Sequence, residues 1–418
     1  MADNTPIEWT DATWNPITGC TLVSEGCRHC YAARLAATRL QHHPSRKGLA
    51  RLNAAGEAKF TGEVRFNDGW LDQPLRWKRP RMIFVAAHGD LFHPKVTDEQ
   101  LDQIFAVMAL CPQHTFQVLT KRPERARAYL TRPAGNGLQN IHNHIAWDAV
   151  GLIANRFLDG WKTEGVDGPK RRLVIQAAAH WPLPNVWLGT SVEDQKRADE
   201  RIPELLGTPA AVRWISAEPL LGPVEWKRWL PTARKAFRPG GEPFLTPDFF
   251  MTKCEHCGWS GSSELVHLAR GWDDADCICP SCCRSFLCDE TPKIDWVVAG
   301  GESGPGARPM HPDWVRSLRD QCAAAGVPFL FKQWGAFAPS DPVDVLLGRA
   351  GKHARGALLH RDGHIITDAE VDRLLGDAEF DLEPFQQMID VGKGRAGRLL
   401  DGVLHDGFPA RSAPGAAE

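Results

Sequence analysis

The chain has 418 residues, of which 43% are hydrophobic and 24% charged, a balance typical of a globular protein with a substantial core. Its length allows one large domain or two to three ordinary ones. The net charge of −2 gives the whole chain no excess of positive charge to attract a polyanion. No run of about 18 apolar residues is present, so we expect no membrane span.

The first residues, "MADNTPIEWTDATWN", have neither a basic segment nor an apolar one, so we expect no secretory signal and a cytoplasmic location. Thiols stay reduced in that compartment. The sequence has twelve cysteines, and ten of them fall in two clusters, at 20–30 and 254–288. Clustered cysteines in a reducing compartment indicate metal binding before disulfides.

The first cluster lies in "NPITGCTLVSEGCRHCYAARL" and contains Cys20, Cys27 and Cys30. Three thiolates can hold three corners of a 4Fe–4S cluster and leave one iron open to a small molecule. The alternative is a zinc site completed by His42 or His43. The spacing Cys-x6-Cys-x2-Cys therefore predicts a metal centre with either three or four protein ligands.

A basic segment overlaps this cluster. Between Arg28 and Arg51 there are six arginine or lysine residues and no acid, and further basic groups follow at 76–81 and 121–127. Such a surface can attract phosphates. It can equally consist of solvated helix faces.

Short apolar runs that end in polar or glycine-rich turns recur along the chain and predict strands buried on both faces. They lie at 81–90, 114–123, 185–194, 211–220, 294–304 and 327–335. Helical patterns separate most of them, at 97–111, 194–206 and 311–326. The first of these helices should begin with a capping box of Thr97 and Gln100, and the last should end on a glycine.

This alternation predicts an α/β fold with a parallel sheet, partly or fully closed into a β/α TIM-like barrel, with an open doubly wound sheet as the alternative. An extra strand near the N-terminus would give about seven strands. Functional residues are expected at the carboxyl ends of the strands in either fold. The polar residues at these ends are His88, Asp90, Lys121, Arg122, Thr190, Ser191, Glu193, Ser216, Glu218, Glu302, Ser303, Lys332 and Gln333.

Two segments interrupt the rhythm, at about 131–184 and 231–290. We therefore expect a barrel over 1–340 with two insertions. Residues 341–418 would form a C-terminal extension that packs on the barrel, and its last residues should be disordered.

The second cysteine cluster lies inside the second insertion. Cys254-x2-Cys257 and Cys279-x2-Cys282 are spaced as in a zinc ribbon, and four thiolates make a closed, structural zinc site. The additional cysteines of 254–288 leave a second iron–sulfur cluster as the alternative.

Seven motifs resemble, in order, a phage-associated family of unknown function that is similar to the radical S-adenosylmethionine superfamily. They are "WNPITGCTLVSEGCRHCYA", "DLFH", "LTKRP", "WLGTSVE", "SAEPLLGPV", "GGESGPGARPM" and "FKQWG". The superfamily usually spaces its cysteines as C-x3-C-x2-C, so the gap from Cys20 to Cys27 is longer here.

The resemblance implies that Cys20, Cys27 and Cys30 bind a 4Fe–4S cluster whose open iron binds S-adenosylmethionine. By strand order it implies that Asp90 contacts the amino group of this cofactor. It also implies cofactor contacts from later strand ends, at Thr190, Ser191, Glu193, Ser216 and Glu218. Substrate contacts are expected from Lys121, Arg122, Glu302, Ser303 and Lys332, whereas no catalytic residue is assigned.

These observations together predict a radical S-adenosylmethionine enzyme that forms a 5′-deoxyadenosyl radical, with an electron donor for its cluster as partner. The basic segments, the zinc ribbon and the phage association favour a nucleic acid or nucleotide as substrate. The alternative is a non-catalytic zinc or iron–sulfur protein that binds nucleic acid.

Overall fold

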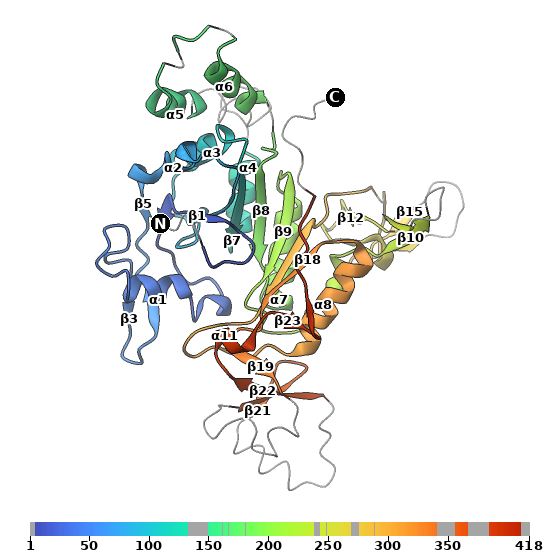
Figure 1. Cartoon of the computed structure of the whole chain (residues 1–418). Helices are drawn as coiled ribbons and strands as arrows, with labels where there is room; N and C mark the ends of the chain where they lie inside the picture. The colour runs from blue at the N-terminus through green and yellow to red at the C-terminus, as the bar shows by residue number, and fades with distance from the viewer. Residues whose placement is uncertain are drawn as a thin grey trace, which may run out of the picture. The chain divides into compact units, whose positions relative to one another are not determined.

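A computed structural model shows the fold of the chain (Figure 1). The residues that the structure describes are 5–132, 149–160, 162–165, 167–179, 181–237, 243–247, 249–268, 276–287, 289–340, 356–366 and 384–410. The predicted disorder of the last residues falls outside this part, as do Cys288 and shorter stretches of both predicted insertions.

Seven strands form the main sheet, in the order β1-β6-β7-β8-β9-β17-β18. Their registered pairs β1–β6, β6–β7, β7–β8 and β17–β18 are all parallel. The fold is therefore mixed α/β and compatible with a partial β/α barrel, and the predicted N-terminal strand is present. The strands are β1 Ala12–Trp14, β6 Met82–Val85, β7 Thr115–Thr120, β8 Val186–Ser191, β9 Val212–Ala217, β17 Trp296–Gly300 and β18 Phe329–Gln333.

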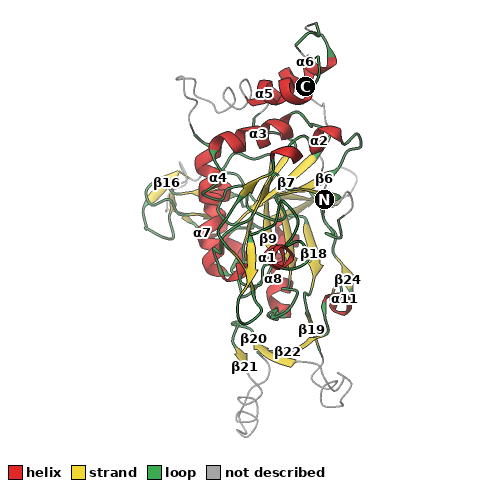
Figure 2. Ribbon diagram, turned by 90° about the vertical axis from the view of Figure 1, so that its left-hand side faces the viewer, coloured by secondary structure: helices red, strands yellow, loops and turns green. Residues whose placement is uncertain are grey.

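The three predicted helices form where the apolar periodicity places them, as the red ribbons of Figure 2 show. They are α3 Asp98–Ala109, α7 Gln195–Leu206 and α8 Pro312–Ala325. Helix α3 starts with the predicted capping box, in which Thr97 accepts from the Gln100 amide and Gln100 accepts from the Thr97 amide. Helix α8 ends at Gly326, whose φ of 67° is left-handed and suits glycine.

The chain divides into two compact units, of which the first comprises residues 1–191, 207–214 and 410–418. Trp14, Phe116 and Trp214 are fully buried in its core. Besides its strands of the main sheet and α3, this unit contains β2 Ile17–Thr18, α1 Tyr31–Ala37, β3 Ala50–Leu52, β4 Ala58–Phe60, β5 Arg65–Phe66, α2 Gln73–Arg76, α4 Pro123–Leu130, α5 Val150–Phe157 and α6 Pro169–Ala179.

The second unit comprises residues 192–206 and 215–409. Its smaller elements are β10 Ala233–Phe237, β11 Pro243–Pro247, β12 Met251–Lys253, β13 Ser260–Ser262, β14 His267–Leu268, β15 Asp276–Ile278, β16 Ser285–Leu287, β19 Phe337–Pro339, β20 Gly356–His360, β21 Ile365–Ile366, β22 Phe385–Asp390, α11 Lys393–Ala396, β23 Leu399–Leu400 and β24 Val403–Leu404. Strands β19 to β22 form a sheet of their own, in the order β19-β22-β20-β21. The domain boundary predicted at residue 340 stays a prediction.

No helix in the described ranges is long and apolar enough to cross a membrane. The two isolated cysteines, Cys111 and Cys322, are fully buried and belong to the apolar core.

Candidate functional site

The cysteine loop of the first unit leaves the main sheet at the carboxyl end of β1, where an active site is expected in such folds. Gly19 and Gly89 form a parallel backbone bridge between this loop and the one that follows β6. A Cβ atom at Gly19 would lie 2.1 Å from the carbonyl oxygen of Glu63, and one at Gly89 would lie 3.0 Å from that of Ile17. Glycine at position 89 lets the two bridged backbones approach each other, and glycine at position 19 leaves room for the Glu63 carbonyl, so both fix the start of the loop.

The three cysteines of this loop are free thiols with partial exposure. Cys27 ends a short 3-10 helix, and Cys30 directly precedes α1. Burial raises the pKa of Cys20 to about 12 and also raises that of Cys30, and a smaller contribution to each comes from Cys27. The charge of Cys27 thus acts on both other thiols of the loop. Among the described residues, the group placed to hold a single metal ion is Cys254, Cys257, Cys279 and Cys282, and it does not include these three cysteines.

The Arg122 guanidinium connects this loop to the next strand ends. Its Nη1 lies 3.5 Å from the Cys20 sulfur and 2.8 Å from Asp90 Oδ2, and its Nη2 donates to Thr21 Oγ1 at 2.7 Å. The Arg122 and Asp90 side chains are 7% and 6% exposed, so this ion pair is buried. Arg122 thus places a positive charge beside one of the three thiols.

The Asp90 carboxylate is fully engaged by donors of the protein. Its Oδ1 accepts from Phe92 N at 3.0 Å and Thr120 Oγ1 at 2.7 Å. Its Oδ2 accepts from Lys121 N at 3.2 Å and from Arg122. Four donors fill its acceptor positions, so in this geometry Asp90 orients Arg122. The contact with a cofactor amino group stays a prediction.

His93 completes the network. Its Nδ1 accepts from Lys95 N at 3.1 Å, so the proton of the neutral ring lies on Nε2. This Nε2 then donates to Thr21 Oγ1 at 3.1 Å. Sequence reasoning missed Thr21, His93 and Thr120 as members of the site, although all three lie inside the motifs "WNPITGCTLVSEGCRHCYA", "DLFH" and "LTKRP".

Other predicted residues of the first unit lie close to these groups. The Lys121 charge lowers the pKa of Cys30 in part, which places it near that thiol, although burial has the larger, opposite effect. Thr190 donates its hydroxyl to the Thr120 carbonyl at 2.9 Å and is fully buried, as is Ser191. Thr190 therefore joins neighbouring strand ends through a hydrogen bond.

In the second unit each predicted carboxylate has a basic partner. The ion pairs are Glu193 with Arg201 at 2.8 Å, Glu218 with Lys332 at 2.6 Å and Glu302 with Arg308 at 2.7 Å. Of the two predicted serines of this unit, Ser216 is buried and Ser303 is partly exposed. The substrate and cofactor roles of these carboxylates and serines stay predictions.

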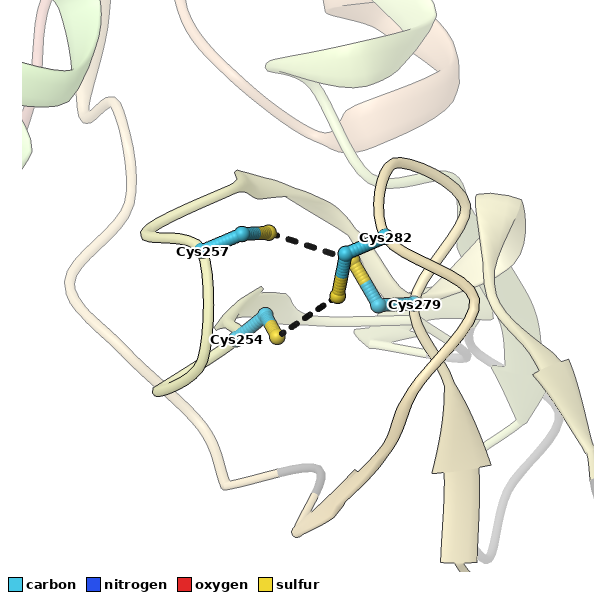
Figure 3. A group of neighbouring side chains, drawn as sticks. All are labelled: Cys254, Cys257, Cys279 and Cys282. Atoms are coloured by element: carbon cyan, nitrogen blue, oxygen red, sulfur yellow. Dashed lines mark hydrogen bonds between the residues drawn. The ribbon is translucent and has the colours of Figure 1, made fainter.

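The second cysteine cluster forms a compact four-sulfur site (Figure 3). The sulfur atoms of Cys254, Cys257, Cys279 and Cys282 all lie within 4.8 Å of one another. Two of the distances are 3.9 Å, from Cys254 to Cys282, and 3.6 Å, from Cys257 to Cys279. These four residues can hold a metal ion.

Backbone amides around this site favour the thiolate form. The Trp259 amide lowers the pKa of Cys257 to about 7, and Ser281 N donates to the Cys279 sulfur at 3.4 Å. Cys254 and Cys279 pack in a small core with Cys277 and Phe286, against which the Trp259 ring also packs. Trp259 therefore has a structural role in this small core.

Comparisons with known proteins give one family. A search of curated proteins finds no match, and neither does a search of solved structures. Residues 4–409 match the family described as protein of unknown function (DUF5131), so the match extends over nearly the whole chain. The chain belongs to this family, DUF5131.

Proposed function

We propose that the protein is an iron–sulfur enzyme of the radical S-adenosylmethionine type. The observation that supports the proposal is the position of the loop with Cys20, Cys27 and Cys30 directly after the carboxyl end of β1, where Arg122 of the buried Arg122–Asp90 pair lies 3.5 Å from the Cys20 sulfur. Three thiolates without a fourth protein ligand leave a cluster one open coordination position. In the described part of the chain, Cys20, Cys27 and Cys30 belong to no group of side chains placed around a single metal ion, with or without a histidine.

The residues at this loop fit a 4Fe–4S cluster in the chemistry of their donors. Thiolates are the usual ligands of such clusters, and the thiolates bind different iron atoms, so their spacing is wider than around one ion. A positive group that donates a hydrogen bond to a ligand sulfur compensates the negative charge of the thiolates. Arg122 Nη1 lies within hydrogen-bond distance of the Cys20 sulfur, at 3.5 Å. When bound, the cluster and S-adenosylmethionine supply a 5′-deoxyadenosyl radical.

The protein's own residues then have separate tasks. Cys20, Cys27 and Cys30 would hold the cluster, and Arg122 would compensate charge at Cys20. Asp90 and Thr21 hold the guanidinium in place through the hydrogen bonds described above. Buried arginine pairs of this kind keep their geometry because breaking them exposes a charge to an apolar environment.

The four-cysteine site is proposed to hold zinc. Four sulfur atoms at tetrahedral positions, each about 2.3 Å from a zinc ion, lie about 3.8 Å apart. The sulfur–sulfur distances of 3.6 Å between Cys257 and Cys279 and 3.9 Å between Cys254 and Cys282 agree with that value. Ligands of an iron–sulfur cluster bind different irons and stand wider apart, so this spacing favours zinc over a second cluster. A closed site with four thiolates would be structural.

We propose a nucleic acid or nucleotide as the substrate class, on the grounds of the basic segments and the zinc ribbon. An external electron donor would reduce the cluster. A reducing cytoplasm fits the free thiols of all eleven cysteines in the described part.

The test is anaerobic reconstitution of the full chain with iron and sulfide. The proposal expects a brown protein that releases 5′-deoxyadenosine when reduced with S-adenosylmethionine. Cys27→Ala should lose both the visible absorption and the product. Cys283→Ser is the matched control because Cys283 is exposed and outside both ligand sets, and it should keep both. A colourless wild-type protein with zinc in both sites would instead support the non-catalytic alternative and overturn the enzyme.

A further inference from the structure

Arg46 is a buried cation without an acidic partner. Its exposed fraction is 5%, and no carboxylate lies within ion-pair distance of it in the described ranges of the chain. One guanidinium nitrogen donates to Ser45 Oγ, the Cζ atom lies 5.7 Å from the centre of the Trp70 ring, and Nε is buried without a hydrogen-bond partner. The guanidinium of Arg46 therefore makes fewer hydrogen bonds than its donors allow.

Such an arrangement is costly for the folded chain. Taking a charged group out of water is strongly unfavourable unless a partner of opposite charge compensates it. A cation–π contact compensates only a small part of that loss. Burial, together with a smaller repulsion from the Arg65 charge, lowers the pKa of Arg46 to about 10. The contacts with Ser45 and Trp70 offset only part of this cost.

A second cation and a histidine lie around Arg46. Arg65 donates to the carbonyls of Pro44 and Lys47, which flank Ser45 and Arg46 in the chain, and it too has no ion pair with a carboxylate among the described residues. His88 carries a buried Nδ1 without a hydrogen-bond partner, and Arg46 lies close enough to lower its pKa, after burial. These groups all lie within the first unit.

We propose that Arg46, Arg65 and His88 form a binding site for one phosphate group. A phosphate dianion offsets two guanidinium charges, whereas a carboxylate would offset only one. Its oxygens accept the forked donors of arginine and the ring N–H of a neutral histidine. A single fully buried arginine suits one phosphate better than a track along a nucleic-acid backbone.

The site has a defined position relative to the cysteine loop. Tyr31, which follows Cys30, raises the pKa of Arg46 in part, so its ring lies near the guanidinium. The Tyr31 and His88 rings are 6.1 Å apart in an edge contact. A phosphate at Arg46 would therefore anchor the nucleotide or nucleic-acid substrate beside the cysteines, and in this sense the inference rests on the proposed function.

The test is calorimetric titration of the full, reconstituted chain. Binding of inorganic phosphate and of adenosine monophosphate shows whether the site takes a phosphate group. Comparing single-stranded oligonucleotides with and without a 5′-phosphate shows whether that group can belong to a nucleic acid. Arg46→Met should weaken phosphate binding at least tenfold and should also raise the denaturation midpoint of the ligand-free protein, because it removes an uncompensated charge. Arg51→Met removes an exposed charge of the same basic segment and should change binding less than twofold.

Several outcomes would overturn the site. They are the absence of phosphate binding to the wild type, unchanged binding by Arg46→Met, and equal weakening by Arg51→Met. Should Arg46→Met not fold, Arg46→Lys keeps the charge, loses the fork and is expected to bind phosphate more weakly. Cluster content is measured separately by visible absorption. A chain that binds the cluster but no phosphate refutes only this inference. A chain that binds phosphate but no cluster refutes only the proposed function.

Discussion

Replacement of Arg122 by methionine tests the buried network beside Cys20. The variant leaves the Asp90 carboxylate buried, at 6% side-chain exposure, without its cation. Removal of one partner of a buried ion pair costs about 3–5 kcal/mol, because the remaining charge is uncompensated. Asp90 keeps three of its four donors, namely the two amides and the Thr120 hydroxyl, so the lower part of this range is expected.

The double variant Asp90→Asn/Arg122→Met separates this pair from simple loss of packing. Both charges are then absent, so the double variant should be more stable than the sum of the single effects predicts, by at least about 1 kcal/mol. Arg122→Lys keeps the charge but not the fork, and should fall between wild type and Arg122→Met.

The assay is guanidinium denaturation of the metal-free chain, followed by tryptophan fluorescence, with variants compared only where they share one slope. An additive double variant would refute the coupling. A cost below about 1 kcal/mol for Arg122→Met, which is the range of exposed pairs, would refute the buried ion pair itself.

Three further predictions concern other parts of the chain. Gly19→Ala should destabilise the protein by about 1–3 kcal/mol and reduce cluster uptake, because φ is +93° and the new Cβ would meet Glu63 O; an unchanged denaturation midpoint would contradict it. Cys279→Ser should lose one zinc per chain by elemental analysis and lower the melting temperature, whereas Cys283→Ser should retain the metal. Hydrogen bonding to arginines of α8 lowers the pKa of Asp401. At this exposure the ionised carboxylate contributes a few tenths of a kcal/mol to the stability of the folded chain, which is present at neutral pH and lost as the pH falls through the folded pKa. The difference in stability between the wild type and Asp401→Asn should therefore vanish in acid.

Periodicity along the sequence was sufficient for the main sheet. The runs at 81–90 and 294–304, for example, contain β6 and β17, because strands buried on both faces are continuously apolar. The sheet of β19 to β22 was not predicted, since its strands are short and partly exposed and give no such run. Apolar runs in a sequence indicate that a strand is buried, so partly exposed strands produce no pattern by which they could be predicted.

Long-range pairing was beyond the sequence. Arg122 was predicted as a substrate contact from its position at a strand end, yet it lies beside Cys20, 102 residues earlier, and Asp90, 32 residues earlier. Arg46 was one of six cations in a segment without acids, and only the structure distinguishes it as buried. The spacing of Cys254, Cys257, Cys279 and Cys282, by contrast, was sufficient to predict that these four thiols gather.

The contact between Gly19 and Gly89 bears on how the first cysteine loop can vary in length. The loop is tied to the β6 end on one side and to the start of α1 on the other, so residues inserted between Cys20 and Cys27 extend a segment whose ends are already fixed. Each doubling of a flexible loop costs only about 0.6 kcal/mol of closure entropy. A gap of six residues, in place of the three of the superfamily that the motif resembles, is thus a small energetic change, and insertions there should be tolerated better than any substitution of the two glycines.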